Sequence, residues 1–203
     1  LTECIKKGRE YIHWDEKREA YKNQNGPVRR GVGMAMFIYK TGVYPISLET
    51  ASARITLNQD GSIQLSMGAT EIGQGADTVF TQMAAETTGI SVDRVYINST
   101  QDTDVTPFDT GAYASRQTYV SGMACKKCAL EFRQKVLEYA AYMLNHDVTD
   151  LSKTVYADLV KEAAGKVRQV LGLHAEEEIT WEMLDIADSQ VVVNGGDPVL
   201  FDV

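Results

Sequence analysis

A strand pair that leads directly into a glycine-rich turn and a helix is the feature of this sequence that most limits its fold. Apolar and polar residues alternate over 53–57 and again over 63–67, with turn-forming residues between them at 58–61. This period of two predicts a β-hairpin with one buried face. Apolar spacings of three and four over 76–88 then predict a helix that stops at Gly89. We therefore expect a small sheet with this helix packed on it.

The turn between the second strand and the helix carries glycines at positions 68, 73 and 75. Glycine lets the backbone turn sharply and approach a ligand closely. The start of a helix adds unpaired N–H groups and the positive end of the helix dipole, which together favour an anion. Many strand-to-helix turns carry glycines for steric reasons alone. On local grounds, an anion site and a purely structural turn are both open.

A second junction of a loop and a helix follows about forty residues later in the sequence. The polar, irregular stretch 99–111 is long for a connection, and loops of this length often have a function. It leads into residues 111–118, after which an apolar stripe predicts a helix to about Asn145. Ser115, Arg116 and neighbouring polar side chains lie at the start of this helix. They either bind an anion or form an N-cap followed by a surface arginine.

Composition excludes several classes of protein. The 203 residues carry a formal net charge of −8, which argues against general nucleic-acid binding. The sequence has neither a signal-peptide pattern nor an apolar run of the roughly 20 residues that a membrane span needs. Three cysteines without a secretion signal suit a reducing, cytoplasmic setting. Cys125 and Cys128 lie within the long helical pattern without a second Cys/His pair, so we expect small buried apolar side chains.

The remaining patterns complete an α+β fold with a mixed sheet and packed helices. We divide the chain into an N-terminal helical segment (1–24), a small sheet with the first junction (25–110), and a region of long helices with a terminal hairpin (111–203). The other expected elements are a buried strand at 31–39, a strand at 93–98, a helix at 159–171, a short helix that Thr180 caps, and a hairpin at 190–200.

The two glycine-bearing junctions, Thr70–Gly75 and Gly111–Gln117, resemble those of the molybdopterin-binding large subunit of xanthine dehydrogenase and aldehyde oxidase. The similarity is strongest to bacterial xanthine dehydrogenase. It extends beyond the junctions to most of the chain. The further segments that fit are Arg29–Ala35, Asp60–Ser62, Gln101–Pro107 and Gln190–Gly195.

The resemblance implies a role for each junction residue. Gln74 is similar to the glutamine whose amide lies against the metal–pterin cofactor, and Gly73 and Gly75 let the backbone come close. Ala114 is similar to the residue whose backbone lies beside the molybdenum. Three further residues match the helix start that holds the pterin or its phosphate: Ser115, Arg116 and Gln117. N–H groups, a hydroxyl and a guanidinium are suitable phosphate donors. No residue of this chain is expected to ligate the metal directly.

The resemblance also implies what this chain lacks. Val43 and Tyr44 fall near the loop that lines the substrate channel in the family. The family's catalytic glutamate, its Gly-Gly-Phe-Gly turn and its Phe-Arg-Gly loop match nothing here. We therefore assign no catalytic residue. The missing motifs, together with Leu1 as the first residue, lead us to expect one excised piece of a larger subunit. Iron–sulphur clusters and FAD would lie on other domains or subunits, which would be the partners of this chain.

The implied parent enzyme is a molybdenum hydroxylase that oxidises purines or related heterocycles, and the 203 residues alone are expected to be inactive. An aldehyde-type substrate is an alternative within the same family. Two other hypotheses come from different classes. One is a module that binds a nucleotide or a pterin phosphate without a redox role, and the other is an acidic interaction module. Apolar surface left uncovered in such a piece would favour self-association.

Overall fold

The computed structural model describes residues 1–43, 45, 49–98, 102–146, 155–195 and 201–202. Side chains are described for these residues except 155–157 and 201–202. Contacts within the chain divide it into two compact units, Leu1–Tyr39 and Lys40–Val203. Tyr44 lies outside the described residues, so its expected place near a substrate channel has no structural description.

The first unit holds two short helices and an extended segment. The helices are α1 (Thr2–Tyr11) and α2 (Trp14–Ala20), and neither has a buried residue. The helical segment expected over 1–24 is observed as these two helices, which end at Ala20, and His13, in a left-handed conformation with φ at 52°, separates them.

The buried strand expected over 31–39 is wrong. This apolar segment belongs to no described strand, and its side chains are largely exposed, with Phe37 at 88% and Ile38 at 82%. A strand needs a neighbour that pairs with its N–H and C=O groups, and Leu1–Tyr39 contains no described strand that could serve. The segment is apolar, as the sequence shows, but its side chains could be buried only against a partner that covers them.

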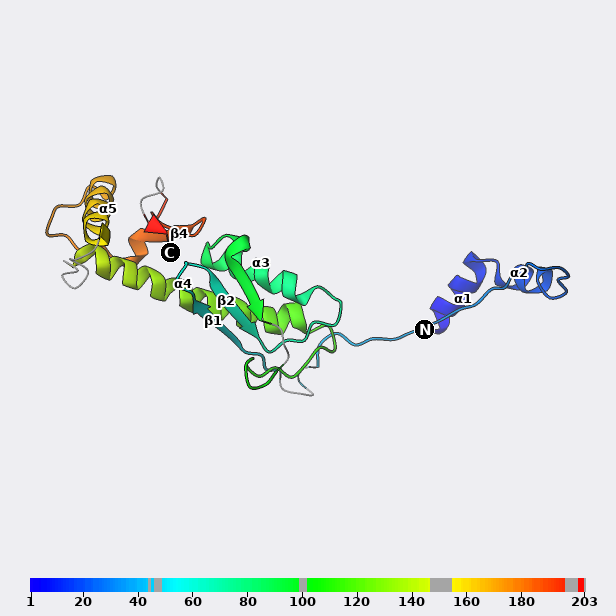
Figure 1. The fold of residues 1–203 in the computed structure, drawn as a ribbon. Helices are drawn as coiled ribbons and strands as arrows, with labels where there is room; N and C mark the ends of the chain where they lie inside the picture. The colour runs from blue at the N-terminus through cyan, green and yellow to red at the C-terminus, as the bar shows by residue number, and fades with distance from the viewer. Residues whose placement is uncertain (44, 46–48, 99–101, 147–154, 196–200, 203) are drawn as a thin grey trace. The chain divides into compact units, whose positions relative to one another are not determined.

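The second unit is built on a three-stranded mixed sheet (Figure 1). The first two strands, β1 (Ala53–Leu57) and β2 (Ile63–Met67), pair antiparallel with Ile55 opposite Leu65. This confirms the predicted hairpin. The chain then forms α3 (Ala76–Thr88) and the short η1 (Val92–Arg94), and returns as β3 (Val95–Asn98), which is parallel to β2. Because a parallel pair needs a crossover, α3 lies on the sheet.

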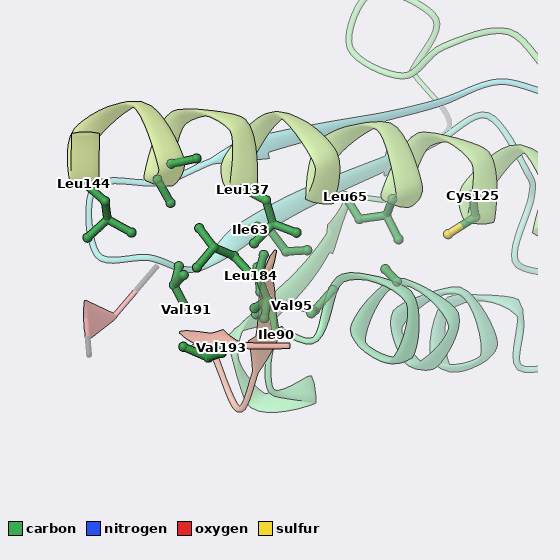
Figure 2. Close-up of a cluster of buried hydrophobic side chains, with 14 of the residues drawn as sticks. Ile63, Leu65, Ile90, Val95, Cys125, Leu137, Leu144, Leu184, Val191 and Val193 are labelled. Atoms are coloured by element: carbon green, nitrogen blue, oxygen red, sulfur yellow. The ribbon is translucent and has the colours of Figure 1, made fainter. Parts of the chain in front are cut away.

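A long helix completes the layer on the sheet. A π-helical turn, η2 (Gln117–Ser121), runs into α4 (Gly122–Asn145), which packs on α3 and β1. Figure 2 shows Cys125, Leu137 and Leu144 of α4 directed at the core. Cys125 is fully buried, and its thiol donates to the carbonyl oxygen of Phe80 on α3 at 3.6 Å. Helix α4 therefore connects the first junction's helix with the rest of the core.

The last third forms a second sheet under the far half of α4. Helix α5 (Val155–Leu171) and the short η4 (Trp181–Met183) precede the strands β4 (Leu184–Ala187), β5 (Gln190–Val193) and β6 (Phe201–Asp202). β5 pairs antiparallel with both β4 and β6. The first strand of the hairpin expected at 190–200 is observed as β5, whereas residues 196–200 of its expected second half lie outside the described residues. The pairing of β5 with β4 was not predicted. Thr180 makes no side-chain cap of η4.

The observed helices and mixed sheet confirm the predicted α+β class. No helix among the described residues is both long and apolar enough to cross a membrane.

Candidate functional site

The structure brings the two junctions together through the side chains of Gln74 and Gln117. The Gln74 amide nitrogen donates to the Gln117 side-chain oxygen and to the carbonyl oxygen of Thr70 at 2.9 Å. The Gln117 amide nitrogen also donates to the Thr70 carbonyl, at 2.7 Å. The Gln74 oxygen accepts from the N–H of Ile72 at 2.7 Å. Gln117 is buried while Gln74 is exposed, so the pair extends from the core to the surface.

An internal carboxylate occupies the start of α3. Glu71 Oε1 accepts from the N–H groups of Gly73 (2.6 Å) and Gly75 (3.2 Å), and its Oε2 accepts from that of Asp77 (3.1 Å). The hydrogen bond from Asp77, followed by those from the two glycines, holds the pKa of Glu71 below its ordinary value. The anion at this helix start is therefore the chain's own side chain, and what the first junction presents outward is the Gln74 amide.

Gly73 and Gly75 are required by backbone conformation. Their φ angles are 94° and 81°, a region that side-chain-bearing residues rarely adopt. A Cβ atom at either position would meet nothing within 4 Å, so the backbone here is open to a ligand.

The second junction has donors that the protein leaves unused. Ala114 and Ser115 have φ angles of 49° and 54°, and this left-handed turn starts the helix. Among the described residues, the backbone N–H groups of Gln117, Thr118 and Tyr119 find no protein acceptor. The Ser115 hydroxyl is exposed beside them. Free N–H groups at the start of a long helix form a site for an anion.

The side chain of Arg116 is not at the surface, where the sequence predicted it. Its side chain has no exposed surface, and its Nε donates to Glu49 at 2.5 Å. Its Nη1 donates to Asp109 and to the Gly111 carbonyl, and its Nη2 donates to the Thr50 carbonyl at 2.6 Å. Four of its five N–H donors are therefore used inside the protein. In this structure the guanidinium does not face outward as a phosphate donor, and the arginine holds the turn from within.

Two carboxylates, those of Glu49 and Asp109, pair with the single guanidinium of Arg116. Burial alone would lower the pKa of Arg116, but the hydrogen bonds and charges of Glu49 and Asp109 raise it above its ordinary value. Asp109 is fully buried and also accepts from the Ser121 hydroxyl at 2.7 Å and the Gly111 N–H at 2.9 Å. The guanidinium therefore remains charged and fixes the loop on both sides of Ala114–Ser115.

The segment before the sheet lies against the same turn. The Gly42 N–H donates to the Ala114 carbonyl at 2.7 Å. The Val43 N–H donates to Glu49 Oε1 at 3.2 Å. Through Glu49 the structure links Val43 to the second junction, and its expected place near a substrate channel stays a prediction.

Three carboxylates that shape the site were not identified from the sequence: Glu49, Glu71 and Asp109. For Glu71 a signal existed, because a carboxylate just before a helix start commonly binds its free N–H groups. For Glu49 and Asp109 no local signal exists, because their shared partner is Arg116, 67 and 7 residues away.

The cysteines take no part in the site. Burial raises the pKa of Cys125 to about 12, so its thiol stays protonated and unreactive at neutral pH. Within the described residues, no group of three or more His, Cys, Asp or Glu side chains could hold a metal ion.

Comparison with known proteins shows the family to which the chain belongs. The sequence profile of the molybdopterin cofactor-binding domain family matches residues 7–192. The chain belongs to this family. It is 51% identical over 152 residues to the xanthine dehydrogenase molybdenum-binding subunit of Escherichia coli O157:H7, covering 75% of this chain and 20% of the relative.

More distant relatives extend the family to other substrates. A protein of Escherichia coli K12 named "Probable hypoxanthine oxidase" is 38% identical over 151 residues, covering 74% of this chain and 15% of the relative. The carbon monoxide dehydrogenase large chain of Afipia carboxidovorans is 30% identical over 173 residues, covering 81% of this chain and 20% of the relative. The chain thus spans a fifth or less of the length of these relatives. The resemblance to the xanthine dehydrogenase family is confirmed.

Proposed function

We propose that this chain forms one wall of the molybdopterin site in a molybdenum hydroxylase, with the amide pair Gln74–Gln117 and the free N–H groups of residues 117–119 as its contacts. The observation that carries the proposal is the convergence of these groups. The two glutamine side chains meet at Thr70, directly beside a helix start whose first N–H groups have no acceptor among the described residues.

The donor set fits a phosphorylated pterin at the second junction rather than the first. The N–H groups of Gly73 and Gly75 are already bonded to Glu71. Those of Gln117, Thr118 and Tyr119 find no acceptor in the described chain, and the Ser115 hydroxyl adds a fourth donor. We assign the phosphate or pterin end to this helix start, because aligned N–H groups favour an anion there.

The other residues have distinct roles. Gln74 contributes an exposed, uncharged surface beside backbone that Gly73 and Gly75 leave open, and its amide N–H donors hold that surface on Thr70 and Gln117. The backbone of the turn at Ala114 and Ser115 would lie beside the metal of a bound cofactor, and the buried Arg116 holds that turn. When bound, the cofactor supplies a redox-active metal that accepts two electrons from the substrate carbon being hydroxylated. The chain's own contribution is to bind and orient it.

We further propose that purines are the substrates of the parent enzyme. The support is the 51% identity to a xanthine dehydrogenase subunit, against 30% to a carbon monoxide dehydrogenase chain. An aldehyde-type substrate in the same family is the alternative, because no described residue of this chain is assigned to the substrate itself except Val43. The general base would lie outside these 203 residues.

We propose that the remaining parts of a larger subunit, together with iron–sulphur and FAD components, are the partners of this chain. The apolar segment 34–39 supports this, because its exposed side chains would be covered in such an assembly. In the isolated chain, the same segment would promote self-association.

Metal and nucleotide measurements separate the hypotheses. Reconstituted with the rest of the subunit, the protein should contain about one molybdenum and one pterin per chain. The isolated chain should neither hydroxylate xanthine nor bind GTP tightly. Xanthine turnover by the 203 residues alone would contradict the proposal. Tight GTP binding without molybdenum in the reconstituted protein would favour a nucleotide-binding module instead.

A further inference from the structure

Glu49 joins two segments that no other described side chain joins. Its Oε2 accepts from Arg116 Nε at 2.5 Å, and its Oε1 accepts from the Val43 N–H at 3.2 Å. One carboxylate therefore contacts the second junction through one oxygen and the Gly42–Val43 segment through the other. Its side chain is 15% exposed, so the ion pair with Arg116 is shielded from water.

A second contact, between backbone atoms, joins the same two segments. The Gly42 N–H donates to the Ala114 carbonyl at 2.7 Å, and Gly42 itself has φ at 75°. The backbone of residue 42 is thus fixed on the residue whose own backbone is assigned to the cofactor. Its position depends on Glu49, which holds the next residue.

Asp109, the other carboxylate that pairs with Arg116, bonds only nearby residues through its side chain. Its side-chain partners are Gly111, Arg116 and Ser121, which lie within 12 residues, in the second junction or in the helical turn that follows it. Glu49 differs because its side chain also bonds a segment outside the second junction. It bonds the arginine from outside, 67 residues earlier in the chain.

We propose that Glu49 is a positioning residue that seats the Gly42–Val43 segment against the Ala114–Arg116 turn and so sets the substrate side of the cofactor site. The proposal rests on the proposed function for its link to substrate, but its structural half stands on the chain alone. Charge is essential to the role, because a single side chain must accept from a guanidinium and from a backbone N–H at once.

The Glu49→Gln variant tests this role because it keeps the shape and removes one acceptor. A glutamine oxygen can accept from Val43 or from Arg116, and its NH₂ group then faces the other donor. We expect amide hydrogen exchange at Gly42 and Val43 in the 203-residue chain to rise by about tenfold. Exchange at the core strand residue Leu65 should rise much less. Glu86→Gln, on the exposed side of α3, is the matched control and should change none of them.

Gly42 is the informative position, because its N–H donates to the Ala114 carbonyl rather than to Glu49. Unchanged exchange at Gly42 and Val43 in Glu49→Gln would overturn the proposal. So would an equal rise at Leu65, because that would show a general loss of stability rather than a loss of position.

Kinetics with xanthine in the molybdenum-loaded protein that includes this chain provide the second test. Glu49→Gln should keep the molybdenum content and raise KM at least about fivefold, with kcat changed much less. A variant that loses molybdenum, or that keeps both constants, would overturn the proposal. If wild-type protein holds no molybdenum, the proposed function fails, whereas the exchange experiment still decides whether Glu49 positions residues 42 and 43.

Discussion

The side-chain amide of Gln74 donates to the side-chain oxygen of Gln117, 43 residues further along the chain. Both amides also donate to one carbonyl, that of Thr70. Gln74 precedes α3 and Gln117 begins the turn that leads into α4, so this contact fixes the two helix starts relative to each other. The site is therefore one surface made by two junctions, which this amide pair joins.

The carboxylate of Glu71 stabilises the first junction in a pH-dependent way. Its pKa is lowered in the folded protein, so its contribution to stability is complete above the unfolded-state pKa of about 4.3 and is lost as the pH falls through the folded value. We expect Glu71→Gln to be less stable than wild type at pH 7. Urea unfolding should show that this difference shrinks as the pH falls below about 4. A difference that stays constant from pH 7 to pH 3 would contradict the assigned role.

Removing Asp109 should destabilise the fold strongly. Asp109→Ala leaves the buried Arg116 with one carboxylate instead of two and leaves Gly111 N–H and Ser121 Oγ without their acceptor. We expect a loss of about 3–5 kcal/mol in the free energy of unfolding, measured with urea. The control is Glu162→Ala, which breaks an exposed pair with Lys166 on α5 and should change stability little. Equal effects of the two substitutions would contradict the buried cluster.

Gly68 and Gly165 should respond to alanine with opposite signs. A Cβ atom on Gly68 would overlap the Pro107 carbonyl and lie 2.8 Å from the Asp109 nitrogen, so Gly68→Ala must displace the loop that carries Asp109. We expect a loss of about 1–3 kcal/mol. Gly165, inside α5, has nothing within 4 Å of such an atom, and Gly165→Ala should add about 0.5–1 kcal/mol. Thermal unfolding of both variants measures this, and a stabilised Gly68→Ala would show that no close approach exists there.

Exposed apolar side chains in the segment 34–39 should make the isolated chain self-associate. Phe37 and Ile38 are the most exposed of them. Replacing both with serine should shift the sedimentation profile towards the monomer at the same protein concentration. The matched control is Tyr11→Ser, which removes an aromatic residue of similar exposure, 87%, from α1. If both variants sediment like wild type, the segment has no part in association.

Local patterns predicted the elements around the site. The alternation over 53–57 and 63–67 correctly predicted a hairpin, and the observed register places the apolar Ile55 opposite the apolar Leu65. Gly89 ends α3 as expected, with φ at 80°. The long helix was also predicted from its apolar stripe. These features depend on neighbours that are close in sequence, and sequence patterns carry that information.

Features that depend on distant partners could not be predicted in this way. The guanidinium of Arg116 is a suitable phosphate donor, but in the fold it is buried and donates to Glu49, which lies 67 residues away. The segment 31–39 has the composition of a buried strand, but no described strand of its own unit pairs with it. Gln74 and Gln117 were each identified as site residues, whereas their contact became known only from the fold.

The most direct test of this account is the molybdenum content of four proteins: wild type, Gln74→Ala, Gln117→Ala and the double variant, each within the complete subunit. Because the two amides act as one contact, we expect each single substitution to lower the molybdenum per chain nearly as far as the double substitution does. Thermal stability of each variant, measured alongside, shows that the fold is retained. Wild-type molybdenum content in the double variant would contradict the claim that the Gln74–Gln117 pair holds the cofactor.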